Sequence, residues 1–232
     1  MSKKTPSMNA NQAISEWAKA HPDQRLDEVE DMSLQFMHPP IKVMSDRLAQ
    51  LANCKKLSLS TNNIEEIGFL PPRIEILAIG RNMLKKLDKI DKAAATLQQL
   101  WMSYNNIKSF APLQSCKRLR VLYAAHNNID KLSEIDKLSQ LPNLEDIVLV
   151  GNPLYEQLHS KKTYRQEIVK RLKKLTVLDG ENLAELAVQG DEGTSAPVGD
   201  ASQKTGNTTG AASGNGSRSV SPRPDSTSSN PK

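Results

Sequence analysis

The feature that most constrains the fold of this chain is an eleven-residue pattern that occurs five times in its central part. The pattern is L-x-x-L-x-L-x-x-N-x-I/L, in which two apolar residues stand two positions apart and an Asn follows three positions later. The five copies begin at Cys54, Ile74, Leu97, Leu119 and Leu144, and their Asn residues are spaced 20 to 25 residues apart. Repetition at a nearly fixed period of this length indicates a solenoid, in which similar coils stack along one axis.

Each copy has the residue alternation of a short β-strand. Leu57 and Leu59, for example, alternate with polar residues, so the apolar pair points into the coil and its neighbours point outward. One coil cannot bury its apolar side alone, and stability must therefore come from stacking. The pattern is typical of leucine-rich repeats. It predicts an α/β solenoid with a parallel sheet on one face, short helices and turns on the other, and helical caps at both ends.

The recurring Asn follows the strand at the point where the chain must turn. A turn inside the coil leaves backbone N–H and C=O groups without strand partners, and a buried amide side chain can bond to both kinds of group. We therefore expect these residues to form a structural ladder that links each coil to the next. The ladder comprises Asn62, Asn82, Asn105, Asn127 and Asn152.

The segments on either side of the repeats predict the remaining organisation. The predicted regions are a disordered start (1–7), an N-terminal cap helix (8–28), the repeats (29–159), a C-terminal cap (160–189) and a disordered Gly/Ser-rich tail (190–232). Trp17 falls on the apolar stripe of the first cap, and the second cap is expected to start with one helix over 160–174. The tail holds too few apolar residues to offset the cost of ordering.

Composition and motifs exclude several classes of function. The four His residues have no metal-ligand spacing, and phosphate-binding loops and nucleophile motifs are absent, so we predict a non-enzymatic protein without metal or cofactor. No apolar run reaches the roughly 18 residues that a membrane helix needs, and the first residues lack the apolar core of a signal peptide. Cys54 and Cys116 stand where small buried side chains belong. These features predict a reduced, cytoplasmic protein that does not contact a membrane.

The outward residues of the predicted sheet differ from those of an ordinary solvated sheet, which are Lys, Glu, Thr and Ser. Adjacent strands lie about 4.8 Å apart, so Trp101, Tyr123 and Val148 should form a continuous apolar row. Such a patch is typical of a protein-binding site, although a terminal segment folded over it would explain the same residues. The candidate partner-binding residues are Ile76, Gln99, Trp101, Ser103, Val121, Tyr123, Val148 and Val150.

A second candidate surface is basic, because residues 161–174 carry seven Lys or Arg residues and one Glu. The residues are Lys161, Lys162, Arg165, Lys170, Arg171, Lys173 and Lys174. A basic helix face is compatible with plain solvated surface, with an acidic partner such as tubulin, or with nucleic acid. The segment has neither interleaved aromatic residues nor an RNA-binding motif, so nucleic acid is not expected as a partner.

Several strings resemble the axonemal dynein light chain 1 family, the leucine-rich light chains of the outer dynein arm. The strings are LANCKKLSLSTN, LWMSYN, LEDIVLVGNPL and LKKLTVLDG, and the resemblance covers about residues 10–182. It implies a non-catalytic subunit in the axoneme of a cilium or flagellum. It implies that the sheet face binds the dynein heavy chain at the motor, near the microtubule-binding stalk, and tunes microtubule engagement and beating. It also implies that the basic segment lies toward the heavy chain or tubulin.

Two other functions are compatible with the same repeats. One is an adaptor in an RNA–protein complex of the splicing type, and the other is a regulatory subunit of a phosphatase. Phosphatase-type relatives usually have more than five repeats, and splicing-type relatives lack the strings LANCKKLSLSTN and LWMSYN. Both features favour the dynein interpretation.

Overall fold

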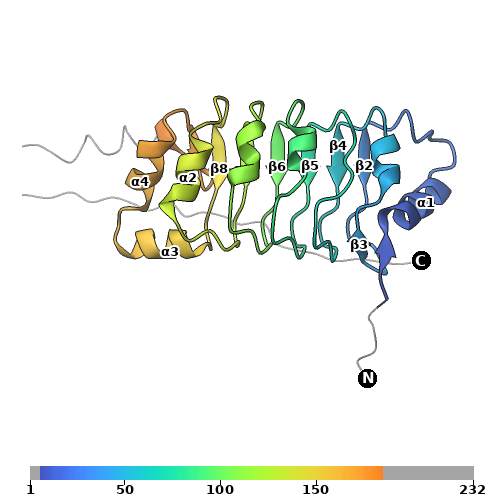
Figure 1. Cartoon of the computed structure of the whole chain (residues 1–232), viewed down its shortest axis with the longest axis horizontal. Helices are drawn as coiled ribbons and strands as arrows, with labels where there is room; N and C mark the ends of the chain where they lie inside the picture. Colours follow the sequence, from blue (N-terminus) through green and yellow to red (C-terminus); the bar gives the residue numbers. More distant parts are fainter. Residues whose placement is uncertain (1–5, 185–232) are drawn as a thin grey trace, which may run out of the picture. The chain divides into compact units, whose positions relative to one another are not determined.

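The computed structural model describes residues 6–184 of the chain (Figure 1). A two-residue strand and a helix come first, and successive coils then each add one strand to a common sheet. Two helices and two further short strands follow near the C-terminal end of the described residues. The predicted tail, 190–232, and most of the predicted disordered start, 1–7, lie outside the described residues.

The strands of successive coils form one sheet in the order β10-β9-β8-β7-β6-β5-β4-β2. Every neighbouring pair is parallel except β9 and β10. The strands are β2 (Asp31–Ser33), β4 (Lys56–Ser58), β5 (Ile76–Ala78), β6 (Gln99–Trp101), β7 (Val121–Tyr123), β8 (Asp146–Val148), β9 (Val177–Leu178) and β10 (Glu181–Asn182). A separate parallel pair joins β1 (Met8–Asn9) to β3 (Ile41–Val43).

The segments that connect the strands carry short helices. They are the 3₁₀ helices η1 (Asp46–Gln50), η2 (Ile90–Ala93) and η3 (Ala111–Ser115), and the α-helix α2 (Leu132–Leu138). The connection that holds Pro71 and Pro72 has no helix, as expected for residues that lack a backbone N–H. The parallel sheet, the short helices between its strands and the helical caps confirm the predicted α/β leucine-rich repeat solenoid.

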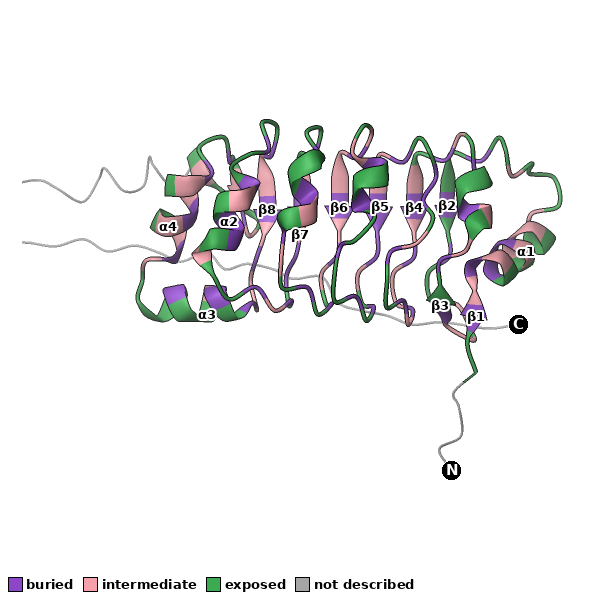
Figure 2. Cartoon of the chain, in the orientation of Figure 1, coloured by how far each residue is buried: buried purple, intermediate pink, exposed green. Residues whose placement is uncertain are grey.

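The core runs without interruption from coil to coil. In Figure 2 the central residue of β4, β6 and β8 is buried, whereas the residues on either side are partly exposed. Leu57, Leu77, Leu100 and Leu122 are neighbours in register and are fully buried. Complete burial of one such side chain contributes about 1.5–3 kcal/mol. Stacking therefore supplies the stability that a single coil lacks.

Each repeated Asn makes the same set of hydrogen bonds. The Oδ1 atom of Asn105 accepts from the N–H of Leu84 in the preceding coil at 2.9 Å. Its Nδ2 atom donates to the carbonyl of Ile79 in the preceding coil and to that of Met102 in its own coil, both at 3.0 Å. The same set occurs at Asn62, Asn82, Asn127 and Asn152. The bonds point back to the preceding coil and satisfy backbone groups that the turn leaves without strand partners.

The residue before each of these Asn residues has a left-handed backbone conformation. The φ angle is 58° at Thr61, 54° at Arg81, 60° at Tyr104 and 51° at His126, and at the last repeat Gly151 has a φ of 71°. Only glycine adopts this conformation without steric cost. Four of the five repeats therefore place a strained side chain at this point of the turn.

The N-terminal cap is the helix α1 (Ala10–Ala20), which covers the first coils. A reciprocal pair of hydrogen bonds starts it: the N–H of Gln12 donates to Oδ1 of Asn9 at 3.0 Å, and the N–H of Asn9 donates to Oε1 of Gln12 at 2.9 Å. Ala13 and Ile14 are buried, and Trp17 is partly buried against the core. This cap satisfies free N–H groups at the helix start and closes the apolar end of the solenoid.

The C-terminal cap differs from the prediction of one helix over 160–174. The structure has two helices, α3 (Pro153–Ser160) and α4 (Tyr164–Arg171). Lys162 between them has a φ of 56°, and the N–H of Thr163 donates to the carbonyl of Leu158 at 3.1 Å. The residue with the left-handed backbone is a Lys, so the sequence lacks the Gly or Asn that usually marks the end of a helix. The predicted helix over 160–174 therefore corresponds to α4, which starts only at Tyr164, whereas α3 lies in the stretch that was predicted to be part of the repeats.

Asp179 completes the hydrogen bonding of the last full coil. In earlier coils the strand donates to the next strand, as when the N–H of Ala124 bonds to the carbonyl of Val148. The strand next to β8, β9, has only two residues, and the N–H of Leu149 donates instead to Oδ1 of Asp179, the residue directly after β9, at 2.6 Å. The hydroxyl of Tyr164 donates to the other carboxylate oxygen at 2.6 Å, and burial together with the Asp179 charge raises the pKa of Tyr164. A side-chain carboxylate thus takes the place of the backbone carbonyl that the short strand β9 does not supply.

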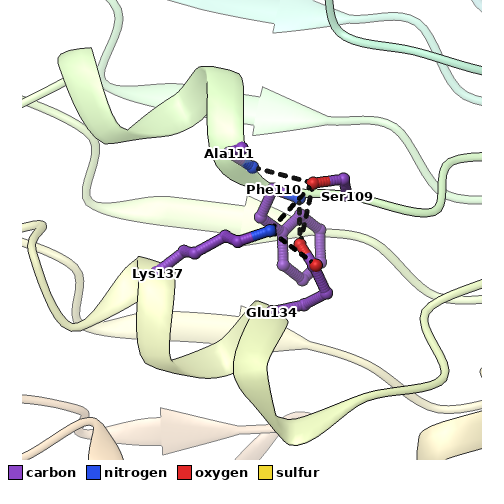
Figure 3. A network of polar contacts seen from close by, with 5 residues as sticks. All are labelled: Ser109, Phe110, Ala111, Glu134 and Lys137. Carbon is purple, nitrogen blue, oxygen red and sulfur yellow. Dashed lines mark hydrogen bonds and ion pairs between the residues drawn. The ribbon is translucent and has the colours of Figure 1, made fainter.

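A buried carboxylate fixes α2 against η3 (Figure 3). Oε2 of Glu134 accepts from the N–H of Phe110 and from the hydroxyl of Ser109, both at 2.9 Å, and its other oxygen pairs with Nζ of Lys137 at 2.6 Å. Burial by itself would raise the pKa of Glu134, but the bonds from Lys137, Phe110 and Ser109 outweigh it and hold that pKa below its ordinary value. The ionised carboxylate therefore stabilises the contact between the two connections.

Candidate partner-binding surface

The outward side of the sheet brings the predicted apolar residues together. In register, Ala78, Trp101, Tyr123 and Val148 are neighbours on β5, β6, β7 and β8. The rings of Trp101 and Tyr123 are stacked, with centroids 6.1 Å apart and planes inclined by 17°. Both side chains are partly exposed. The strands therefore hold two large aromatic rings side by side on an accessible face.

Two further rows flank this aromatic row. The residues two positions earlier on the same strands also face outward and are neighbours in register: Ile76, Gln99, Val121 and Asp146. The residues just after the strands are small, and they include Gly80, Ser103, Ala125 and Val150. The hydroxyl of Ser103 accepts from the N–H of Ala125 at 3.1 Å. All eight predicted partner-binding residues are partly exposed and lie on this one face of the sheet: Ile76, Gln99, Trp101, Ser103, Val121, Tyr123, Val148 and Val150.

Asp146 is a residue of this face that the sequence analysis did not select. Its Oδ2 atom accepts from the hydroxyl of Tyr123 at 3.0 Å. Burial raises the pKa of Asp146, the Tyr123 hydrogen bond opposes that effect, and the charges of Glu145 and Asp179 add to it. Oδ1 of Asp146 and Nε1 of Trp101 are buried and have no hydrogen-bond partner among residues 6–184. Unpaired buried polar atoms of this kind are uncommon and call for an explanation.

The N-terminal part of the same face has a different character. Nζ of Lys56 pairs with Asp31 at 2.8 Å, and the hydroxyl of Ser58 donates to Gln35 at 3.3 Å. These exposed polar pairs are what a solvated sheet is expected to carry. The apolar patch is therefore confined to β5 through β8.

The basic segment is less uniform than a single helix face. Arg165 pairs with Glu181, Arg171 pairs with Glu167 and with Asp136, and Lys174 donates to a backbone carbonyl. The four residues of the set that make neither an ion pair nor a side-chain hydrogen bond inside the described part of the chain are Lys161, Lys162, Lys170 and Lys173. Lys161 and Lys162 lie in the turn before α4 rather than on it. The seven cations thus divide into three whose side chains have internal partners and four exposed lysines whose side chains have none within residues 6–184.

Thiols and side chains that can ligate a metal are a third set of candidate groups among the described residues. Cys54 and Cys116 are buried free thiols, and burial raises the pKa of Cys54 to about 11, which keeps it protonated and unreactive. Between residues 6 and 184 no group of three or more His, Cys, Asp or Glu side chains is placed to hold a metal ion. Over the same range no helix is long and apolar enough to cross a membrane.

Comparisons with known proteins identify the family. Residues 95–137 match the family model described as Leucine Rich repeats (2 copies). The chain is 46% identical over 158 residues to dynein axonemal light chain 1 of Chlamydomonas reinhardtii. The matched residues cover 66% of this chain and 80% of that protein. It is 39% identical over 183 residues to the human protein of the same name, covering 78% and 94%, and 39% identical over 171 residues to the rat protein, covering 73% and 90%. The chain therefore belongs to the axonemal dynein light chain 1 family.

Proposed function

We propose that this chain is a non-catalytic light-chain subunit of axonemal dynein that binds the dynein heavy chain through the sheet face. Family membership places the chain in the axoneme of a cilium or flagellum. The binding surface in this proposal consists of the aromatic row and its two flanking rows on β5 to β8. By binding near the microtubule-binding stalk of the motor, the subunit would tune microtubule engagement and beating.

The observation that supports this proposal most directly is the stacked pair of Trp101 and Tyr123. Trp and Tyr dominate the binding energy of protein interfaces when they lie near the centre of the contact. Here the two rings are held by neighbouring strands, with small residues such as Ala78 and Ala125 beside them. Little conformational entropy is lost when a partner packs on side chains that are already ordered.

Four exposed lysines of the C-terminal cap, whose side chains bond to no other group within residues 6–184, are proposed as a second, weaker contact. Lys161, Lys162, Lys170 and Lys173 lack internal ion pairs within residues 6–184. Exposed cations of this kind attract an acidic surface over a distance of about 8–10 Å at physiological salt. Tubulin or an acidic part of the heavy chain has the required charge. No observation on the described residues favours the splicing-type or phosphatase-type alternatives.

The test is a binding titration of the full chain against the motor region of an axonemal dynein heavy chain. Trp101→Ala should weaken binding by about 2–4 kcal/mol, as expected for a central aromatic anchor. The control is Phe69→Ala, which removes an aromatic ring that is 45% exposed but lies outside the sheet. Equal affinity of Trp101→Ala and the unmodified chain would refute the sheet-face site. Absence of any binding by the unmodified chain would refute the proposed function itself.

A further inference from the structure

A second stack of planar groups runs along the edge of the sheet where the strands end. The guanidinium carbon of Arg81 lies 4.2 Å from the centre of the Tyr104 ring. The rings of Tyr104 and His126 are 4.4 Å apart with planes inclined by 17°. A Cβ atom at Gly151 would lie 2.4 Å from Nδ1 of His126, so the imidazole rests directly against the Gly151 backbone. We call Arg81, Tyr104 and His126 the edge stack.

The edge stack occupies the strained position of the turn. Its residues have φ values of 54°, 60° and 51°. Gly151 holds the equivalent position of the last repeat, so the turn requires a left-handed backbone but no side chain. Bulky side chains are disfavoured in this conformation, and strained residues cluster at functional sites. An observed strain of this kind suggests that the three side chains have a role beyond the turn.

The edge stack is exposed and carries an uncompensated positive charge. Arg81, Tyr104 and His126 are all exposed, Tyr104 by 43%. Arg81 forms no ion pair with a carboxylate within the part of the chain that the structure describes. Exposed polar side chains gain little from stacking on each other in water. Stability of the fold is therefore a poor explanation for all three.

The position of the edge stack links it to the proposed partner-binding surface. Arg81 and Tyr104 directly follow Gly80 and Ser103, which belong to the row of small residues beside Trp101. A partner that packs on the aromatic row would reach the edge stack across these small side chains. At the other side of the aromatic row, Asp146 supplies a carboxylate. The surface thus has a cationic border after the strands and an acidic residue at the start of β8.

We propose that the edge stack binds a carboxylate-bearing segment of the same dynein partner and thereby fixes the orientation of that partner on the apolar patch. Stacking on Tyr104 holds the Arg81 guanidinium in one plane, which is the geometry that bidentate bonding to a carboxylate requires. The proposal rests on the proposed function, since it names a further contact of the same partner. An apolar patch alone does not specify orientation, whereas a directional ion pair at its border does.

The first experiment measures affinity for the heavy-chain motor region at low and at high salt. Arg81→Gln should weaken binding about tenfold at low salt, and the difference should shrink at high salt because a rim charge is screened. The matched control is Arg73→Gln, which removes an exposed Arg before β5, on the opposite edge of the sheet. Its affinity should stay within about twofold of the unmodified chain, as for a residue outside the interface.

The second experiment separates a binding role from a structural role. Tyr104→Asn removes the ring while keeping a residue that tolerates the left-handed conformation. We expect an unchanged or raised melting temperature together with weaker binding. A lowered melting temperature with unchanged affinity would overturn the proposal, because the stack would then serve the fold alone.

The two experiments also distinguish this proposal from the proposed function. If Arg81→Gln binds like the unmodified chain while Trp101→Ala is weakened, the edge stack lies outside the interface and only the further inference fails. If neither variant changes the affinity, the sheet-face site is refuted and the further inference fails with it. If the unmodified chain does not bind, the proposed function itself fails, and the further inference again fails with it.

Discussion

The two sides of the same three-residue strands have different constraints. On β6 the central Leu100 is fully buried between Leu77 and Leu122, whereas Gln99 and Trp101 on either side face outward. Every interior position repeats the same chemistry, because each coil must pack on the next. The outward positions differ from strand to strand, from the polar pair of Lys56 and Asp31 to the stacked rings of Trp101 and Tyr123. The repeated interior residues therefore specify the fold, whereas the outward residues, which differ from coil to coil, form the proposed binding surface.

We therefore expect substitutions in the interior to lower stability and substitutions on the outward sheet face to weaken binding, each without the other effect. Leu100→Ala should cost about 2–5 kcal/mol of folding free energy, because a fully buried side chain is removed from a continuous core. Urea denaturation measures this loss. Protein that remains folded should bind the heavy-chain motor region with normal affinity, which is the reverse of the pattern expected for Trp101→Ala. A Leu100→Ala variant of unchanged stability would contradict the stacked-core account.

A smaller loss of stability is expected when a residue of the Asn ladder is replaced. Asn105→Ala should destabilise the fold by about 1–3 kcal/mol, because the N–H of Leu84 and the carbonyls of Ile79 and Met102 lose their buried partner. Asn106→Ala is a matched control one residue away, since its side chain is exposed. The measurement is the difference in melting temperature between the two variants. Equal melting temperatures would show that the ladder amide contributes nothing.

The pH dependence of stability should reveal the buried Glu134. Its pKa is lowered in the folded state, so its contribution is present above the unfolded-state value and is lost as the pH falls below about 4.5 and through the folded-state pKa. Glu134→Gln should lower stability at pH 7 by about 1 kcal/mol and flatten this acid-side loss. Denaturation curves at several pH values provide the check. A variant with the same acid-side slope as the unmodified chain would exclude Glu134 as its source.

The smallest stability effect is expected at the basic cap. Lys170→Gln combined with Lys173→Gln should change folding free energy by less than about 0.5 kcal/mol, because both side chains are exposed. Co-sedimentation of the light-chain and heavy-chain complex with microtubules should weaken at low salt. The control replaces two exposed lysines elsewhere, Lys85 and Lys86, by Gln. If both pairs behave alike, the cap lysines are plain solvated surface.

Some features of the site could be predicted and others could not, for identifiable reasons. The row of Trp101, Tyr123 and Val148 follows from strand alternation and a parallel register, both of which the repeat encodes. The hydrogen bond between Tyr123 and Asp146 joins residues 23 positions apart, and it depends on side-chain directions that no pattern records. The break at Lys162 was missed because its left-handed backbone is carried by a residue type that gives no signal. The predicted helix over 160–174 therefore runs through this break, and α3 was not predicted as a helix.

By itself, the sequence determined the coil, its stacking direction and the separation of buried from outward positions. These properties depend on local alternation and on an Asn at a fixed place, and five copies make the pattern unambiguous. Only the tertiary structure decided that Arg81, Tyr104 and His126 lie on one another, and that the carboxylate of Asp179 accepts from the N–H of Leu149. Those contacts join residues from different coils. They depend on backbone angles and side-chain rotamers that are set only when the coils are stacked.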